Sequence, residues 1–508
     1  MMIFSLRPAT AVAAPLIAAL IILFFGNRIK PNIRESITMI ASAIMAAIVF
    51  SMVPGVLKGE IYVSELWQIV DGITLTLKTD SAGMVFACVA SALWILTSIY
   101  SIGYMRGHHE KNQTGYFSAF AVCIASAIGI SLASNLITFF IFYEMLTVAT
   151  YPLVAHYRND KAKFSGRKYL AYTLISGQIF FAAIVWVYVK YGTLDFKAGG
   201  FIEAGSMSSG LMCIMFFMMI VGGAVKAGVM PLHGWLPSAM VAPTPVSALL
   251  HAVAVVKAGA FCVLRVVCYV FGPESAAWCG GAVILSWFAA FTIIISSFIA
   301  MRQDNLKARL AFSTVGQLSY IVLGISLLSV YSITGALFHI VAHAFLKITL
   351  FMCAGAIFVI TGLSEISTMK GLAKKMPITS VCFAISSLGL AGLPLMAGFI
   401  SKFNILEGAM AVNKIFAIVV LIAAALLAIS YLMPVVKVFF CKQEEPCEKD
   451  SPSAKYSKTS IAMVAPIVCT VIISLILGFV PDAGPHLYDM AQTAAESITG
   501  EGGIYLAE

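Results

Sequence analysis

Eight ionisable side chains occur within stretches of this sequence that are otherwise apolar enough to cross a lipid bilayer. Each charge at the centre of a membrane helix costs roughly 2.5–3.5 kcal/mol on insertion scales, so a sequence that keeps several of them is expected to use them. Groups that both hold and release a proton are what a proton or cation path through a membrane requires. The candidate residues for such a path are Glu144, Lys226, His251, Lys257, His339, His343, Lys347 and Lys402.

The composition is that of a polytopic membrane protein. Hydrophobic residues make up 60% of the 508 residues and charged residues only 11%, whereas soluble globular proteins contain about 25% charged residues. A helix needs about 20 apolar residues to span the hydrocarbon core. Runs of that length predict fourteen spans, centred near residues 18, 45, 92, 125, 146, 179, 219, 255, 289, 320, 346, 390, 427 and 470.

The formal net charge of +9 does not indicate a nucleic-acid partner, because the basic residues cluster in alternate loops. The positive-inside rule assigns such loops to the cytoplasm. The intervening loops are acidic, and both termini are therefore expected on the non-cytoplasmic side. The basic clusters contain Arg28, Lys30 and Arg34; Arg106 and Lys111; Arg158, Lys161, Lys163, Arg167 and Lys168; Arg302, Lys307 and Arg309; Lys370, Lys374 and Lys375; and Lys442, Lys449, Lys455 and Lys458.

The sequence predicts no cofactor and no metal site. It contains neither a Walker-type phosphate loop nor a Gly-x-Gly-x-x-Gly fingerprint, and its eleven cysteines form no Cys-x-x-Cys pair. An ion gradient or a partner protein is therefore expected to drive any transport. Outside the spans, residues 69–77 alternate like a short hairpin, and the polar stretch 441–459 is expected to be a solvated linker.

Two spans carry glycine and proline at mid-membrane, each with a lysine. They are the stretches 222–237, with Lys226, and 392–402, with Lys402. Such residues interrupt the backbone hydrogen-bond ladder, and the freed groups are tolerated only where protein or water satisfies them. A pair of broken spans in the two halves of a chain is typical of transporters built from related five-helix repeats. Alternatively, both lysines reach the nearest interface and the prolines only kink their helices.

Glu144 lies about ten residues from either end of its span, too deep for its side chain to reach water. A carboxylate there must be protonated or paired with a cation, either as a proton-linked group or as a static ion pair. His339, His343 and Lys347 recur at i, i+4 and i+8 and form one polar stripe on a helix. They are either a relay or satisfied core residues. His251 and Lys257 are six residues apart and are expected on different faces of one shared helix.

Several ordered motifs between residues 80 and 440 resemble those of a known family. They are Phe142–Glu144, Lys226–Pro237, Ala242–His251, Lys257–Gly259, Asn305–Gln317, His339–Lys347 and Gly392–Lys402. In these motifs the chain resembles the proton-translocating, antiporter-like membrane subunits of respiratory complex I, membrane-bound hydrogenases and Mrp-type sodium/proton antiporters. The region 101–106 and the chain length look most like the D-type member of an Mrp antiporter.

This resemblance implies an all-α membrane protein of about fourteen helices, with two inverted five-helix repeats and two broken helices. It implies four parts: residues 1–110 with helices 1–3 and an external hairpin, 111–270 as the first repeat, 271–440 as the second, and 441–508 with a linker, helix 14 and an external tail. Glu144 would pair with Lys226. Lys257, near His251, would be the central relay that the stripe continues, and Lys402 would be the terminal lysine.

Three functions are compatible with these features. The first is a proton-translocating subunit of a multisubunit Na⁺/proton antiporter in a bacterial plasma (inner) membrane, with other membrane subunits, protons, sodium ions and the lipid bilayer as partners. The second is a proton-pumping subunit of complex I or a membrane-bound hydrogenase, which would place a chain without a redox centre in an oxidoreductase. The third is a membrane scaffold subunit that conducts nothing.

Overall fold

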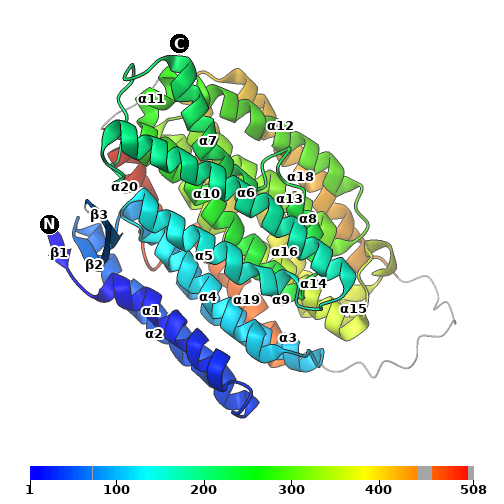
Figure 1. The fold of residues 1–508 in the computed structure, drawn as a ribbon. Helices are drawn as coiled ribbons and strands as arrows, with labels where there is room; N and C mark the ends of the chain where they lie inside the picture. The colour runs from blue at the N-terminus through cyan, green and yellow to red at the C-terminus, as the bar shows by residue number, and fades with distance from the viewer. Residues whose placement is uncertain (71, 443–459, 501–508) are drawn as a thin grey trace.

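The computed structural model of the protein describes residues 1–70, 72–442 and 460–500. In this described part, thirteen helical stretches are long and apolar enough to cross a membrane, and they run side by side as one bundle (Figure 1). The fourteenth predicted span is the pair of shorter helices α16 (Pro377–Ala391) and α17 (Ala397–Ala411). The prediction of fourteen spans is thereby confirmed.

The order of the helices follows the predicted spans closely. The first seven are α1 (Arg7–Phe25), α2 (Pro31–Leu57), α3 (Ser81–Gly107), α4 (Gln113–Ser131), α5 (Leu136–Val154), α6 (Asp160–Tyr191) and α7 (Ser209–Ala227). The eighth comprises α9 (Thr244–Ala252), α10 (Val255–Leu264), the π-helix η2 (Arg265–Phe271) and α11 (Gly272–Trp278). The later long spans are α12 (Gly281–Met301), α13 (Leu306–Ser326), α14 (Val330–Thr361), α18 (Ile415–Phe440) and α19 (Ile461–Phe479). Short helices in the connections are α8 (Trp235–Ser238), η1 (Ala239–Val241), η3 (Ile366–Thr368) and α15 (Leu372–Lys375).

The spans that carry the ionisable residues lie deepest in the bundle. The most apolar part of the α9–α11 span is 100% buried, whereas only 33% of the corresponding part of α18 is. α14 packs against α3, α9, α13, α16, α17, α19 and α20. Lipid tails are as apolar as leucine, so an outer helix such as α18 can be hydrophobic all round, while polar groups need the protein interior.

The two repeats are inverted because each contains five spans, an odd number. The first runs from α4 to the α9–α11 span and the second from α12 to α18, with α16 and α17 forming one broken span. The second repeat therefore begins at the face opposite to that from which the first begins. The broken spans, after α7 and between α16 and α17, are the fourth of five in each repeat. The domain limits at 110, 270 and 440 remain a prediction.

Both breaks lie at a glycine in the left-handed backbone conformation. Gly228 ends α7 with φ +74°, and Gly392 ends α16 with φ +97°. Only glycine adopts such angles without strain, and it commonly ends helices in this way. The two predicted interruptions are confirmed, and each leaves the last carbonyl groups of a helix inside the bundle.

A third interruption was not predicted. α9 ends at Ala252 and α10 begins at Val255, so His251 and Lys257 do not share one continuous helix. The expectation that they share one is wrong. The intervening residues 252–256 are alanine and valine, and they contain none of the glycine or proline that marks the other two breaks.

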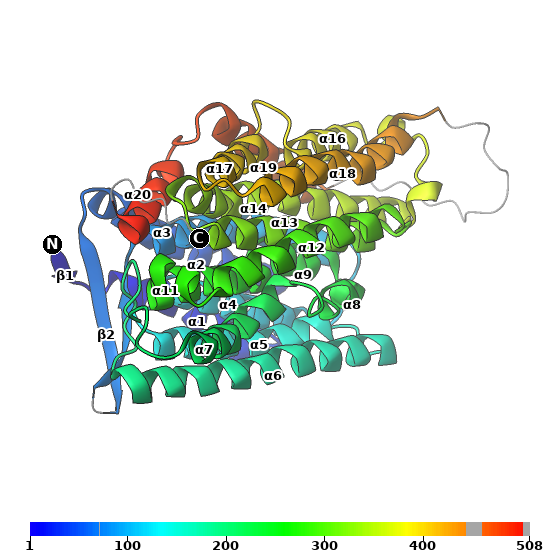
Figure 2. The ribbon, with the colours of Figure 1, turned by 90° about the horizontal axis from the view of Figure 1, so that it is seen from above.

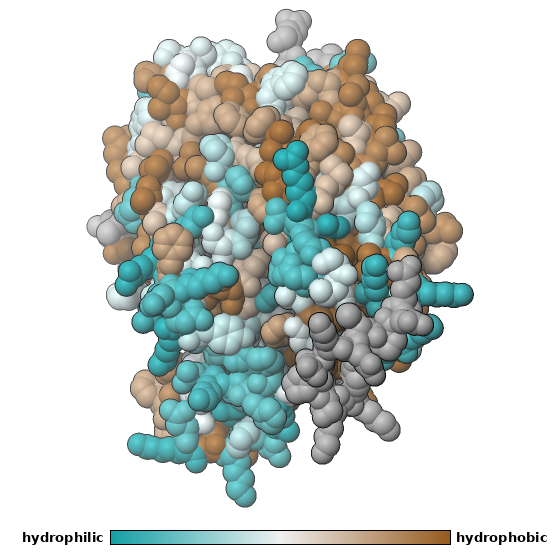
Figure 3. Space-filling model, turned by 90° about the vertical axis from the view of Figure 1, so that its right-hand side faces the viewer, coloured by the Kyte–Doolittle hydropathy of each residue, from teal (hydrophilic) through white to brown (hydrophobic). Residues whose placement is uncertain are grey.

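The two ends of the bundle differ in character. The loops after α1, α3, α5, α12 and α14 lie at one end, which we call the basic face, and hydrophilic side chains gather over this end (Figure 3). At the opposite face β1 (Met2–Phe4) pairs in parallel with β2 (Ile61–Val70), which pairs antiparallel with β3 (Ile73–Lys78). The predicted hairpin is confirmed but begins at Ile61 rather than Ile69. The predicted linker falls on residues 443–459, outside the described residues.

The amphipathic helix α20 (Leu487–Thr499) lies at the same end as the sheet, against α14 and α3 (Figure 2). The prediction treated this segment as a tail. Its apolar residues, such as Leu487, Met490 and Ile498, are buried.

Candidate functional site

One contact between the repeats lies at the centre of the bundle. The amine Nζ of Lys257, on α10, lies 2.7 Å from Nδ1 of His343, on α14. Both side chains are fully buried. An ammonium can donate its proton to an unprotonated Nδ1, and the resulting imidazole N–H can return it, so the pair can pass one proton in either direction. The structure thus brings together two of the predicted residues that lie 86 positions apart.

The stripe on α14 continues from this pair towards the second broken span. The ring centroids of His343 and His339 are 6.0 Å apart. His339 Nδ1 lies 2.8 Å from the hydroxyl of Ser401, the residue before Lys402. Nε2 of each histidine is buried without a hydrogen-bond partner in the described part of the chain. Because imidazole nitrogens in a dry site are costly to leave unpaired, ordered water between the rings is expected.

Lys402 points into the protein at the end of α16. Its amine donates to the carbonyl of Leu390 at 2.7 Å and to that of Ala391 at 3.2 Å. These carbonyls form the negative end of the α16 dipole, where a cation is favoured. The amine also lies 4.8 Å from the centre of the Tyr320 ring. This geometry differs from that of a lysine that extends to the membrane surface.

Tyr320 and Ser401 were not among the predicted site residues. The Tyr320 ring lies 5.8 Å from the His339 ring, and its hydroxyl is buried with no partner among the described residues. Ser401 joins His339 to the helix that carries Lys402. Their sequence context is an ordinary apolar helix, so no signal in the sequence distinguishes them.

Lys347 leads to a side branch rather than to the next histidine. Its amine donates to the hydroxyl of Ser313 at 2.8 Å, and that hydroxyl donates to Tyr431 at 3.0 Å. His251 packs its ring against Phe351 at 4.8 Å, and both of its nitrogens are buried without a partner in the described residues.

Glu144 and Lys226 do not form the direct ion pair that was predicted. Among the described residues no nitrogen–oxygen contact within 4.0 Å joins them; the Lys226 amine instead donates at 2.6 Å to the backbone carbonyl of Tyr143, the residue before Glu144. The same amine lies 3.3 Å from the centre of the Tyr143 ring. The carbonyl and the ring both stabilise a cation, which explains how the lysine is held without the carboxylate.

The Glu144 carboxylate turns towards α6 instead. Both of its oxygens are buried without a hydrogen-bond partner in the described part of the structure. A Cβ atom added at Gly177 would lie 2.3 Å from Oε1 of Glu144, so only glycine leaves room for the carboxyl group there. Gly177 and Tyr143 are further residues that the sequence analysis missed.

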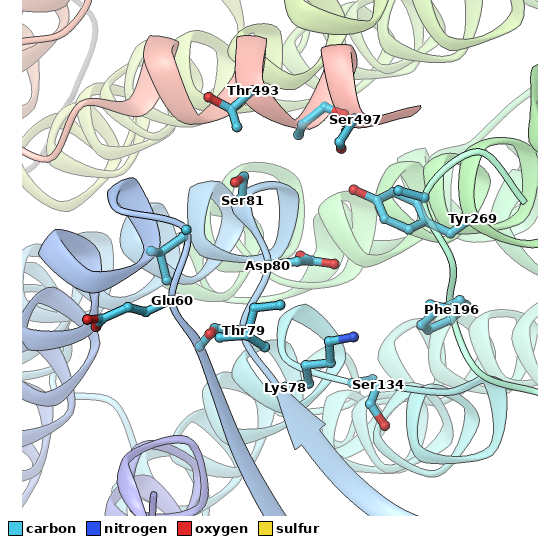
Figure 4. A pocket seen from close by; sticks show the side chains of 16 residues that line it. Glu60, Lys78, Thr79, Asp80, Ser81, Ser134, Phe196, Tyr269, Thr493 and Ser497 are labelled. Carbon is cyan, nitrogen blue, oxygen red and sulfur yellow. Dashed lines mark hydrogen bonds between the residues drawn. The ribbon is translucent and has the colours of Figure 1, made fainter. Parts of the chain in front are cut away.

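Arg265 is a buried charge that the sequence analysis also missed. It is 1% exposed and forms a salt bridge with Asp80, at the start of α3. The rings of Phe196, Phe261 and Tyr269 surround its guanidinium at 4.4–5.0 Å. Asp80 also faces a pocket of about 270 Å³ at the opposite face, between β3, α20 and η2 (Figure 4). The pair joins the α9–α11 span to α3 at that face.

Replacing Arg265 with methionine is expected to destabilise the protein by about 3 kcal/mol, because it removes one partner of a buried ion pair. This value is at the low end for buried pairs because the Asp80 side chain is 29% exposed. Thermal unfolding of the purified protein measures the effect. The double variant Arg265→Met with Asp80→Asn is expected to recover part of the loss. An unchanged unfolding temperature in Arg265→Met would show that the pair contributes nothing.

The predicted residues therefore form three groups rather than one line of contacts. Glu144 and Lys226 lie at the first broken span, Lys257 and His343 at the centre, and His339 and Lys402 at the second broken span. Between these groups the described side chains leave partnerless polar atoms. An arrangement of this kind can move protons in steps through side chains and bound water.

A family model described as NADH:quinone oxidoreductase/Mrp antiporter, TM, matches residues 133–428 of the chain. The protein belongs to this family. The match covers both broken spans and all eight predicted site residues. The resemblance inferred from the motifs is thereby confirmed.

Relatives of known role cover most of the chain. It is 31% identical over 451 residues to NADH-quinone oxidoreductase subunit L of Escherichia coli (strain K12), covering 86% of this chain and 72% of that protein. It is 29% identical over 505 residues to a probable K(+)/H(+) antiporter protein of Rhizobium meliloti (strain 1021), the A/B component of its assembly, covering 97% of this chain but only 48% of that protein. The chain spans about half the length of several of the curated relatives it matches.

The fold is that of a membrane component of a solved complex. The structure of the Mrp complex from Dietzia sp. DQ12-45-1b contains a chain that superimposes with a TM-score of 0.84, covering 98% of both chains at 21% identity. At this identity the similarity establishes the fold alone. The predicted fold class is confirmed.

Proposed function

We propose that this protein is the proton-translocating subunit of a multisubunit antiporter that exchanges a monovalent cation, Na⁺, for protons. The observation that carries the proposal is the contact between Lys257 and His343. It joins the two repeats through two titratable groups in fully buried helices. A scaffold protein has no need of such a pair, because each buried ionisable group is costly in a membrane.

The proton path in this proposal runs along the middle of the membrane. Glu144 and Lys226 load it at the first broken span, Lys257 and His343 connect the repeats, and His339 passes the proton towards Lys402. His251 and Lys347 adjoin the central pair and exchange protons with it. Steps between the three groups use bound water, since no direct contact between the groups is found in the described residues.

The proposed setting is a bacterial plasma (inner) membrane in which the basic face is cytoplasmic. The positive-inside rule supports this orientation, and β1 and α20 then lie outside the cytoplasm. The proposed partners are other membrane subunits, since the relatives named above are themselves subunits. The lipid bilayer surrounds the outward apolar helices, and the exchanged ions are protons and Na⁺.

A second candidate is a proton-pumping subunit of a redox complex. It is favoured by the similarity to subunit L of Escherichia coli, which is the more even match in length. The similarity to an antiporter protein over 97% of the chain and the Mrp-like fold over 98% support the antiporter. The two differ in what drives transport, a cation gradient or a redox reaction.

The test is proton movement in inverted membrane vesicles that contain the whole assembly, followed with a pH-sensitive dye. A proton gradient formed by respiration is expected to collapse on addition of Na⁺ if the assembly is an antiporter. Collapse with K⁺ and not Na⁺ would change the proposed cation. Proton pumping that requires a quinone or hydrogen substrate, with no response to either cation, would favour the redox complex.

Replacing Glu144 with glutamine is expected to reduce cation-dependent proton movement by about 10²-fold or more, because glutamine has the same shape but cannot bind and release a proton. The same vesicle assay measures the rate, and immunoblotting measures the amount of assembled complex. Asp160→Asn, at the exposed start of α6, makes the same chemical change outside the path and serves as the control. Wild-type transport by Glu144→Gln would favour the scaffold role.

A further inference from the structure

A carboxylate on the basic face lies outside the groups described above and is almost completely buried. Glu110 lies in the loop between α3 and α4, and its side chain is only 6% exposed. Its Oε1 accepts a hydrogen bond from the Tyr157 hydroxyl at 2.7 Å and lies 3.0 Å from Nδ1 of His108. Its Oε2 lies 3.7 Å from Nε2 of His156. We call these four residues the Glu110 cluster.

The Glu110 cluster has access to solvent. Glu110 lines a depression of about 690 Å³ on the basic face, together with Lys30, Arg106 and Gln113. Burial raises the pKa of Glu110, but the hydrogen bonds from His156 and Tyr157 and the nearby His108 outweigh it and hold the pKa below its usual value. The carboxylate is therefore ionised at neutral pH and available to accept a proton.

Aromatic and hydroxyl groups lead from this cluster into the bundle. The ring of His108 stacks on that of Tyr104, with centroids 5.9 Å apart and planes 17° from parallel. The Tyr104 hydroxyl lies 3.5 Å from Oγ1 of Thr244, which can donate to it. Thr244 is the first residue of α9, the helix that carries His251.

One face of α9 then presents polar groups in a row. Thr244, Ser247 and His251 are three and four residues apart and so lie along the same face of the helix. All three are fully buried. Within the described residues, the Ser247 hydroxyl and both His251 nitrogens have no hydrogen-bond partner. Leaving such groups unpaired costs about 1–3 kcal/mol each, so ordered water is expected beside them.

We propose that the Glu110 cluster collects protons at the basic face and delivers them through Tyr104, Thr244 and Ser247 to His251. This inference rests on the proposed function and adds a route by which the central pair is supplied. In each step one O–H or N–H bond breaks and another forms, so that a single proton moves and no other reactant is needed. The carboxylate accepts the proton from solvent, and water beside α9 carries it to the His251 imidazole.

The competing explanation is purely structural. The bond between Tyr157 and Glu110 also ties the α3–α4 loop to the α5–α6 loop, and a tie of that kind stabilises the fold without moving protons. A structural role predicts loss of folded protein, whereas a proton-collecting role predicts loss of rate in a complex that remains assembled. The two are therefore separated by measuring rate per folded complex.

The experiment measures the initial rate of cation-dependent proton movement per assembled complex in inverted vesicles. Glu110→Gln, and the double variant Thr244→Val with Ser247→Ala, are each expected to lower this rate about tenfold or more, because both remove proton-carrying groups while keeping side-chain volume. Formate, a small weak acid, is expected to restore part of the rate of Glu110→Gln, since it can carry protons into the depression. Formate is not expected to help the α9 double variant.

Matched controls make the same chemical changes elsewhere. Asp304→Asn alters a carboxylate in the α12–α13 loop at the basic face, and Ser297→Ala removes a buried hydroxyl on α12 that bonds its own helix. Both are expected to keep the wild-type rate. Full rate per folded complex in Glu110→Gln or in the α9 double variant would overturn the inference, as would a loss in Glu110→Gln that formate leaves unchanged. Full transport by Lys257→Met would instead overturn the proposed function.

Discussion

Replacing Lys257 with methionine is expected to abolish proton translocation, with a fall of about 10²-fold or more, while the protein still assembles. Lys257 provides the contact of 2.7 Å that joins α10 to His343 on α14. Methionine fills a similar volume but holds no proton, so the two repeats lose their connection. Since the substitution also removes a buried ammonium, little stability should be lost. The vesicle assay, with thermal unfolding in parallel, measures both quantities.

The control for this prediction is Lys190→Met, at the exposed end of α6, which should leave transport unchanged. A second comparison is His343→Asn, which retains a hydrogen-bonding side chain but does not titrate. It should also stop transport if the pair exchanges a proton. Normal specific activity in Lys257→Met, with or without a change in protein level, would assign the contact a structural role.

Replacing Lys402 with arginine is expected to stop or strongly slow proton transfer although the positive charge is retained. The two carbonyls at the end of α16 that bind the lysine amine can also bind a guanidinium, so the fold should be preserved. Arginine effectively never releases its proton, because its pKa exceeds about 12. A group that passes protons must release them, whereas a lysine that only anchors a helix end needs nothing but length and charge.

Proton movement across a range of pH distinguishes these roles of Lys402. Lys402→Glu is expected to keep part of the transport, since a carboxylate can also accept and release a proton. Lys437→Arg, near the exposed end of α18, is the matched control and should be neutral. If Lys402→Arg transports normally at every pH, Lys402 is an anchor and the proton leaves the path elsewhere.

The predictable part of this protein follows from the cost of placing polar groups in lipid. Because each charge in an apolar span is so unfavourable, Glu144, Lys226 and Lys257 were recognisable as functional candidates from their neighbours alone. Glycine and proline located both broken spans, since their effect on the backbone is local. Arg265 obeys the same cost rule and was overlooked, although its apolar surroundings are visible in the sequence.

The contacts between these residues depended on packing that no local pattern records. Glu144 and Lys226 were expected to pair, but the lysine bonds the Tyr143 carbonyl and the carboxylate turns to the space left by Gly177. The break before Lys257 has no glycine or proline to mark it. The Glu110 cluster combines residues from two loops that neither hydropathy nor helical spacing connects.

The sequence by itself thus determined which residues carry charge within the membrane, how many times the chain crosses it, and where glycine ends two of the helices. These properties depend on side-chain chemistry and on interactions between near neighbours in the chain. Only the tertiary structure decided which groups meet. Lys257 and His343 are 86 residues apart, and their contact exists because α10 and α14 are both enclosed by the surrounding helices. Their orientation is set by the packing of whole helices, which sums many small contacts across the bundle.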